Sequence, residues 1–111
     1  MAHSETAYSI IAERIGGLPG IAEKKMFGGV FFMVDGNMVA GATKRGAMAR
    51  VGKPNEAAAL ALPGVEAATP SGRRMAGFVR IAEPALAEAP ETLERLVDLA
   101  FGFAASLPPK V

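Results

Sequence analysis

Three segments space their apolar residues in the way that is typical of helices. The first follows Ser4, which is a good N-cap residue, and predicts a helix over residues 5–16. The second is short, over residues 57–62, and stops at a Pro-Gly pair. The third begins after Pro84, and its apolar residues recur at helical spacing until two prolines close it at residues 108–109.

Strand-like patterns fill the two intervals between these helices. From residues 24 to 51, short apolar stretches are broken at 35–37 and 44–46, which predicts a meander of three strands. The first break reads Asp-Gly-Asn, and Asp-Gly tolerates the positive φ angles of a tight hairpin turn. Residues 65–70 and 74–82 predict two more strands, so about five strands are expected in total.

The order helix, three strands, helix, two strands, helix lacks the regular alternation that a parallel sheet requires. We therefore predict an α+β fold of two layers, in which helices pack on one face of a mostly antiparallel sheet. The chain has 111 residues, of which 50% are hydrophobic, and this is enough for one core. A single domain over residues 1–111 is expected.

The sequence offers few residues that could carry out catalysis or bind a metal ion. Cysteine is absent, and the one histidine, His3, lies near the N-terminus. The carboxylates are interpreted as solvated surface groups, and the glycines match neither phosphate-binding nor dinucleotide-binding patterns. We predict a protein without enzymatic activity, metal or cofactor. No signal peptide or membrane segment is recognised, and the lack of cysteine favours a cytoplasmic location.

Glycines and methionines mark the predicted strands. Gly28 and Gly29 are interpreted as a bulge or a close backbone approach within the first strand. Five methionines could form a soft-metal site or an adaptable binding surface, but we interpret them as core filling. They are Met26, Met33, Met38, Met48 and Met75.

The basic residues concentrate in two segments that contain no acid, although the net charge of the chain is only +1. Strand alternation places Phe78 between Arg74 and Arg80 on one face, an arrangement that could bind nucleic acid through base stacking and phosphate contacts. The other interpretation is a solvated strand face, which the low net charge favours. The candidate nucleic-acid residues are Lys44, Arg45, Arg50, Lys53, Arg73, Arg74, Phe78 and Arg80.

The first predicted strand is apolar on both of its faces. One face can pack against helices, and the other would then remain as an apolar patch, which is typical of a partner or self-association surface. Phe27, Phe31 and Met33 belong to one alternating set and are the candidate interface residues. A homodimer is one expected form.

Four short motifs are distinctive. Residues 25–30 read Lys-Met-Phe-Gly-Gly-Val, and residues 34–38 read Val-Asp-Gly-Asn-Met. Together with residues 72–79 and the Ser-Leu-Pro-Pro-Lys of residues 106–110, they resemble the TfoX N-terminal domain family, in particular its short stand-alone members. The resemblance implies a compact α+β domain with an antiparallel sheet in a bacterial cytoplasm, without known catalytic residues or cofactor. The namesake regulators promote competence gene transcription and carry a further C-terminal domain, which the short members lack.

A non-enzymatic interaction module that binds a protein partner in a regulatory setting is the leading hypothesis, because of the apolar strand face and the resemblance. Direct nucleic-acid binding through the basic sheet face is the alternative. A small-molecule sensor with a pocket between sheet and helices is a third hypothesis, for which the sequence shows no polar constellation.

Overall fold

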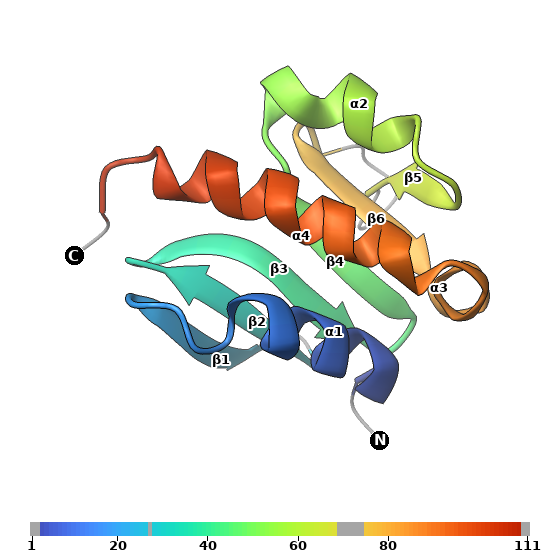
Figure 1. The fold of residues 1–111 in the computed structure, drawn as a ribbon, viewed down its shortest axis with the longest axis horizontal. Coiled ribbons are helices and arrows are strands. Elements are labelled where there is room, and N and C mark those ends of the chain that lie inside the picture. The colour runs from blue at the N-terminus through green and yellow to red at the C-terminus, as the bar shows by residue number, and fades with distance from the viewer. Residues whose placement is uncertain (1–2, 27, 69–74, 110–111) are drawn as a thin grey trace.

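The computed structural model describes residues 3–26, 28–68 and 75–109, which form one sheet with helices on one side (Figure 1). In chain order, the elements are α1 (Glu5–Ile15), β1 (Ile21–Met26), β2 (Gly29–Val34), β3 (Asn37–Thr43), β4 (Gly46–Arg50), the 3-10 turn η1 (Lys53–Asn55), α2 (Glu56–Leu60), β5 (Val65–Ala67), β6 (Phe78–Ala82), α3 (Glu83–Glu88) and α4 (Pro90–Ala105). Within the described ranges, the sheet has six strands in the order β1-β2-β3-β4-β6-β5, and all neighbouring strands are antiparallel. The predicted α+β class is confirmed, with six strands rather than about five.

Helices α1 and α4 lie across the same face of the sheet, and α2 and α3 pack beside them at the β5–β6 side (Figure 1). The strands send Val30, Phe32 and Ile81 into this layer, where they pack with Leu93 and Leu96 of α4. The strand positions in this core include four alanines, Ala40, Ala42, Ala47 and Ala49. Such small side chains let the helices lie close to the sheet. None of the helices in the described part of the chain is long and apolar enough to cross a membrane.

Polar contacts cap α1 and tie it to α4. The Ser4 hydroxyl accepts a hydrogen bond from a backbone amide of the first turn at 3.1 Å. Arg14 of α1 donates two hydrogen bonds to the carboxylate of Asp98 in α4, at 2.8 and 2.7 Å. The hydrogen bond from the Arg14 guanidinium is the main reason that the pKa of the Asp98 carboxyl lies below its usual value. The two helices are therefore joined on their solvent side as well as through the core.

The first predicted strand is a hairpin, so the meander has four strands instead of three. Gly28 has a φ of 75° and lies in the turn between the paired residues Met26 and Gly29. At Gly29, an added Cβ would come 2.5 Å from the carbonyl oxygen of Ala42. The predicted close backbone approach is therefore found at Gly29, whereas the bulge lies further along β2.

Other boundaries also differ from the sequence-based expectation. The last predicted helix is divided into α3 and α4, because Ala89 leaves the helical region with φ −139° and ψ 69°. It precedes Pro90, and a residue before proline is disfavoured in helical conformation. Strands β5 and β6 are shorter than predicted, and residues 69–74 between them lie outside the described ranges. The predicted Asp-Gly hairpin is confirmed, since Asp35 and Gly36 have φ angles of 48° and 84°.

Candidate functional site

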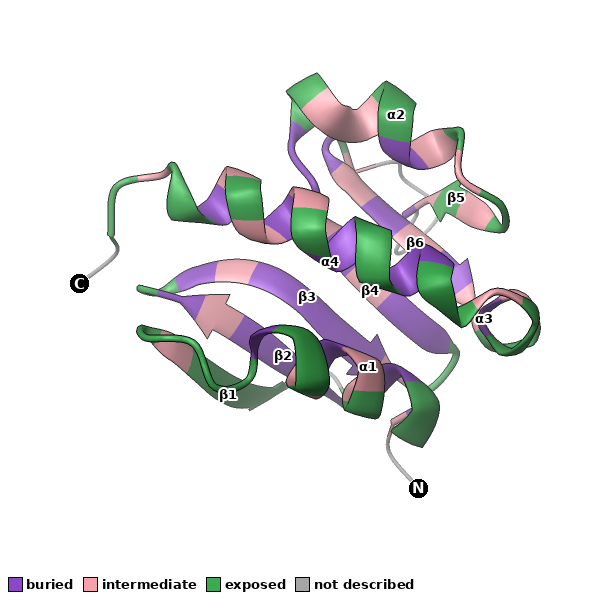
Figure 2. Cartoon of the chain, viewed as in Figure 1, coloured by how far each residue is buried: buried purple, intermediate pink, exposed green. Residues whose placement is uncertain are grey.

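The face of the sheet that is turned away from the helices is called the open face here, because no described helix covers it. Figure 2 views the sheet from the opposite side, where its central strands are mostly buried beneath helices with exposed outer surfaces. Side chains alternate along each strand, so paired residues of neighbouring strands share a face. The middle row of the open face crosses all six strands through Lys24, Phe31, Gly41, Met48, Arg80 and Glu66.

Four strand methionines lie on the open face. Met48 is in the middle row, Met33 and Met38 pair with each other across β2 and β3, and Met26 ends β1. All four are half-buried, and none belongs to the core beneath the helices. Met75 precedes β6 and is half-buried as well. The interpretation of the methionines as core filling is therefore wrong, because alanine, branched residues and Phe32 occupy the helix-facing positions.

Two of the three candidate interface residues lie on the open face, and the third, Phe27, lies outside the described residues. Phe31 is only 3% exposed. Its ring lies over Gly41 of the next strand, where an added Cβ would overlap the ring. Phe31 thus fills the space left by a glycine and offers little exposed area. Met33 is half-buried and contributes to the surface of the open face.

Apart from Arg80 on β6, the described basic candidates form two groups at opposite ends of β4. Lys44 and Arg45 are exposed in the turn before this strand, whereas Arg50 ends it and Lys53 follows in η1. At the usual rise of a strand, the backbones of Arg45 and Arg50 lie roughly 17 Å apart. The two groups therefore do not form one continuous positive patch.

The predicted row of arginines around Phe78 is only partly described, because Arg73 and Arg74 lie outside the described residues. Phe78 and Arg80 share the open face, as alternation predicts. Arg80 donates a hydrogen bond to the carboxylate of Glu66 at 2.8 Å. Much of its charge is thus matched by an acid of the same sheet, which weakens the case for phosphate binding there.

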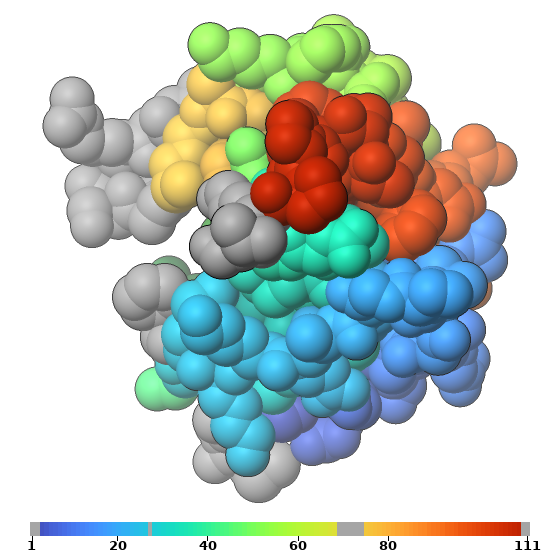
Figure 3. All heavy atoms as spheres, turned by 90° about the vertical axis from the view of Figure 1, so that its left-hand side faces the viewer, coloured from blue at the N-terminus to red at the C-terminus, as the bar shows by residue number. Residues whose placement is uncertain are grey.

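A pocket lies where β4 ends, β6 begins and the last turns of α4 pass by. The guanidinium carbon of Arg50 is 5.9 Å from the ring centre of Phe78 and 5.4 Å from that of Phe103. Figure 3 shows the end of α4, in red, near the residues that open β6, in yellow. The pocket has a volume of about 330 Å³. Lys53, Pro54, Ala76 and the backbone of Gly52 and Gly77 complete its walls.

Phe103, Gly52 and Gly77 are among the pocket residues that sequence reasoning missed. The helical period assigns Phe103 to the apolar face of the last helix, and does not indicate which strand it meets. Gly52 and Gly77 have φ angles of 87° and 84°. They lie together, because the amides of Val51 and Gly52 both donate to the Gly77 carbonyl, at 2.9 and 3.0 Å. The signal in the sequence was a glycine beside the end of an apolar strand, which is typical of close backbone approach.

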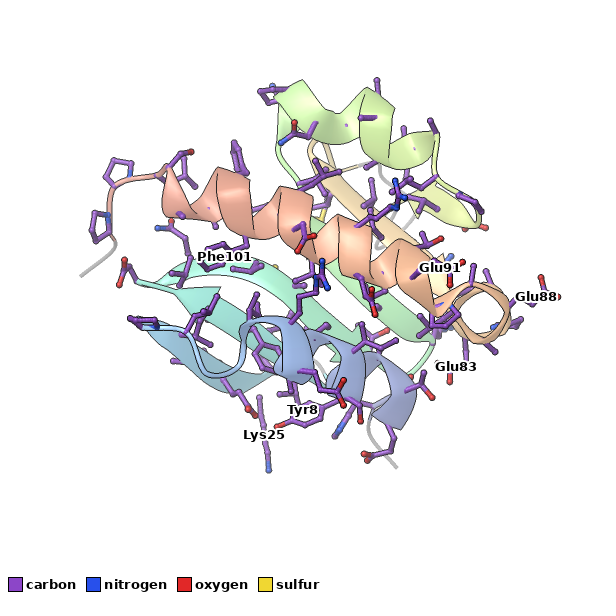
Figure 4. All side chains as sticks on the ribbon, viewed as in Figure 1. Tyr8, Lys25, Glu83, Glu88, Glu91 and Phe101 are labelled. Carbon is purple, nitrogen blue, oxygen red and sulfur yellow. The ribbon has the colours of Figure 1, made fainter. Side chains whose placement is uncertain are left out.

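Acidic side chains gather at the other end of α4. Figure 4 shows Glu83, Glu88 and Glu91 around α3 and the start of α4, whereas Phe101 lies towards the far end of that helix. At the usual rise of a helix, Glu91 and Phe103 are roughly 18 Å apart. In the described part of the chain, no group of three or more His, Cys, Asp or Glu residues is placed to hold a metal ion. These acidic side chains therefore lie far from the pocket.

These features define a small α+β domain whose antiparallel sheet is covered by helices on one face and carries methionines on the other. The model of one protein family, the TfoX N-terminal domain, matches residues 13–104. The chain belongs to the TfoX N-terminal domain family, as its motifs indicate. Comparisons with curated proteins and with solved structures gave no match.

Proposed function

We propose that this domain is a non-enzymatic module that binds a protein partner in a regulatory setting, and that the partner docks on the open face. The main support is that four methionines, Met26, Met33, Met38 and Met48, share this face and are only half-buried. Methionine side chains are flexible and polarisable, so they adapt to apolar partners of different shapes. Membership of a family named after a transcriptional regulator supports the regulatory setting.

The charges of the open face define the chemistry of the partner. Lys24, Arg50 and Arg80 lie on this face, and Glu66 is the acid that pairs with Arg80. A partner segment that presents apolar side chains with carboxylates nearby would match both the methionines and the excess of positive charge. A second copy of the chain would instead bring two positive faces together.

Selection from a displayed peptide library tests this proposal. The wild-type domain should select peptides in which apolar residues are flanked by Asp or Glu. Met48→Glu places a negative charge in the middle row of the open face and should weaken the binding of the selected peptides by about tenfold or more. Ala105→Glu makes the same charge on an exposed position of α4 and should leave their affinity unchanged. Equal affinity for wild type and Met48→Glu would refute the open face as the docking site.

Two other occupants of the open face have distinct signatures. A dimer in analytical ultracentrifugation that Met48→Glu dissociates would assign the face to a second copy of the chain. Fluorescence anisotropy with duplex and single-stranded DNA, at low and at physiological salt, reports nucleic-acid binding. An affinity that falls steeply with salt and is lost in the double variant Arg50→Glu, Arg80→Glu would assign the face to phosphate contacts. Either result would contradict the proposal that a different protein docks on the open face.

A further inference from the structure

We propose that the pocket between the end of β4, the start of β6 and the last turns of α4 binds a small aromatic anion, that is, a flat ring that carries a carboxylate or phosphate group. This site is independent of a partner on the open face, although Arg50 and Phe78 border both. The proposal rests on the charge, the ring contacts and the backbone of the pocket.

The positive charge of the pocket lacks an acidic partner among the described residues. The contacts of Arg50 that the structure describes are with two aromatic rings, and none of them is a hydrogen bond or an ion pair. Within the described ranges, the nitrogen–hydrogen donors of its guanidinium thus have no acceptor and can bind an anion. Lys53 is exposed on the same rim and adds a second cation. Among the described residues that line the pocket, none is an Asp or a Glu. An oxyanion would gain hydrogen bonds from charged donors on two sides.

Apolar surfaces beside these cations favour a ligand with a flat ring. Phe78 on β6 and Phe103 on α4 are both half-buried, so each ring is partly exposed in the pocket wall. The edges and faces of aromatic rings attract other aromatic groups, beyond the effect of area alone. Pro54 supplies a further rigid apolar surface. A simple inorganic anion would use the cations and leave these surfaces unpaired.

Two glycines let the segments that line the pocket pack closely together. An added Cβ at Gly52 would overlap the ring of Phe103, and one at Gly77 would come 3.2 Å from the backbone nitrogen of Lys53. Both glycines also have positive φ angles, of 87° and 84°, which other residues adopt at a cost. The volume of about 330 Å³ is at the low end of the range for small-molecule sites, so the ligand must be compact.

Calorimetric titration of the full chain tests the site with two aromatic anions, each compared with an uncharged counterpart. The pairs are 1-naphthoate with 1-naphthalenemethanol, and adenosine monophosphate with adenosine. We expect at least one anion to bind and its uncharged counterpart to bind at least about tenfold more weakly, which is the loss of a hydrogen bond to a charged group. A gain over the uncharged counterpart for 1-naphthoate alone assigns the site to a carboxylate, and a gain for adenosine monophosphate alone assigns it to a phosphate.

Variants locate the binding on the molecule. Arg50→Gln and Lys53→Gln should each lower the affinity for the anion by about tenfold. Arg45→Gln removes the same charge at the other end of β4 and should leave the affinity unchanged. Phe103→Leu should weaken 1-naphthoate more than it weakens acetate, because only the former contacts the ring. Lys53 is exposed, so its variant reports binding even if Arg50→Gln destabilises the fold.

The proposal fails if neither anion binds at millimolar concentration. It also fails if Arg45→Gln and Lys53→Gln lower the affinity equally, since the binding would then be non-specific attraction to a positive surface. The proposal of a partner on the open face is tested separately with Met48→Glu, which changes no residue of the pocket wall. The two proposals can therefore be separated.

Discussion

The two faces of the sheet are built from the same strands but from different residues. On the helix side, strand residues such as Phe32, Ile81 and Val79 are fully buried. On the open face, Met48 and Arg80 lie in the middle row and are only half-buried. The covered face therefore supplies most of the stability, and the open face leaves flexible and charged side chains for contact with other molecules.

Strand β2 shows this difference between two neighbouring residues. Phe32 is 0% exposed and packs beneath α1, where its ring centre is 5.6 Å from that of Tyr8. Phe31 is 3% exposed but points to the open face, where it lies over Gly41. One ring is buried by the helix layer, and the other is buried because a neighbouring strand lacks a side chain. Burial alone thus does not tell which face of the sheet forms the core.

The largest effect is expected from truncation on the covered face. Phe32→Ala should lower the free energy of unfolding by ~3–5 kcal/mol, because it leaves a cavity in closely packed surroundings. Met48→Ala, on the open face, should lower it by about 1 kcal/mol or less, since solvent can fill the space. Urea denaturation of both variants measures the difference. Losses of equal size would mean that the open face is a second core, and would contradict its assignment as a contact surface.

A smaller effect is expected where the open face depends on a glycine. Gly41→Ala should cost ~1–3 kcal/mol, because the new Cβ overlaps the ring of Phe31 and forces it to move. In a Phe31→Ala background, the same change at Gly41 should be nearly neutral, because the obstructing ring is gone. The double-mutant cycle, measured by urea denaturation, gives this coupling. An equal cost of Gly41→Ala in both backgrounds would show that the ring does not need the glycine.

Much of the fold could be predicted from the sequence, because its signals are local. The helical spacing before Ile15 and the Asp-Gly turn at residues 35–36 depend on neighbouring residues, and both predictions are confirmed. The hairpin at Gly28 was hidden, because apolar residues continue on both sides of the turn. Only the pairing of β1 with β2 reveals that the chain reverses there.

The candidate site was less predictable, because it depends on which face the helices cover. Alternation divides a strand into two sets but does not tell which set is buried, and the methionines were therefore assigned to the core. The pocket brings Arg50 and Phe103 together from distant parts of the sequence. Neither the alternation along a strand nor the helical spacing of apolar residues predicts that contact. The acidic partner of Arg80, which is Glu66 on β5, likewise follows only from the order of the strands.

The smallest effect is expected at the ion pair on the solvent side of the helix layer. Arg14 lowers the pKa of the Asp98 carboxyl in the folded state, mainly by hydrogen bonding. A carboxyl with a lowered folded-state pKa stabilises the protein above its unfolded-state value of about 3.9, and this stabilisation is lost as the pH falls through the folded-state pKa. The side chains are 41% and 54% exposed, so the contribution is small and screened by salt.

Asp98→Asn should therefore be slightly less stable than wild type at neutral pH, and the difference should disappear in acid. Thermal unfolding of both proteins, from neutral pH to below the unfolded-state pKa, measures this difference in stability. Glu94→Gln is the control, because Glu94 is further from Arg14, at 3.7 Å, and no hydrogen bond joins them among the described contacts. If the loss of stability in Asp98→Asn persists unchanged in acid, the substitution disturbs the packing of the helix layer and does not act through charge. The contrast between the helix layer and the open face would then lie in the buried side chains alone.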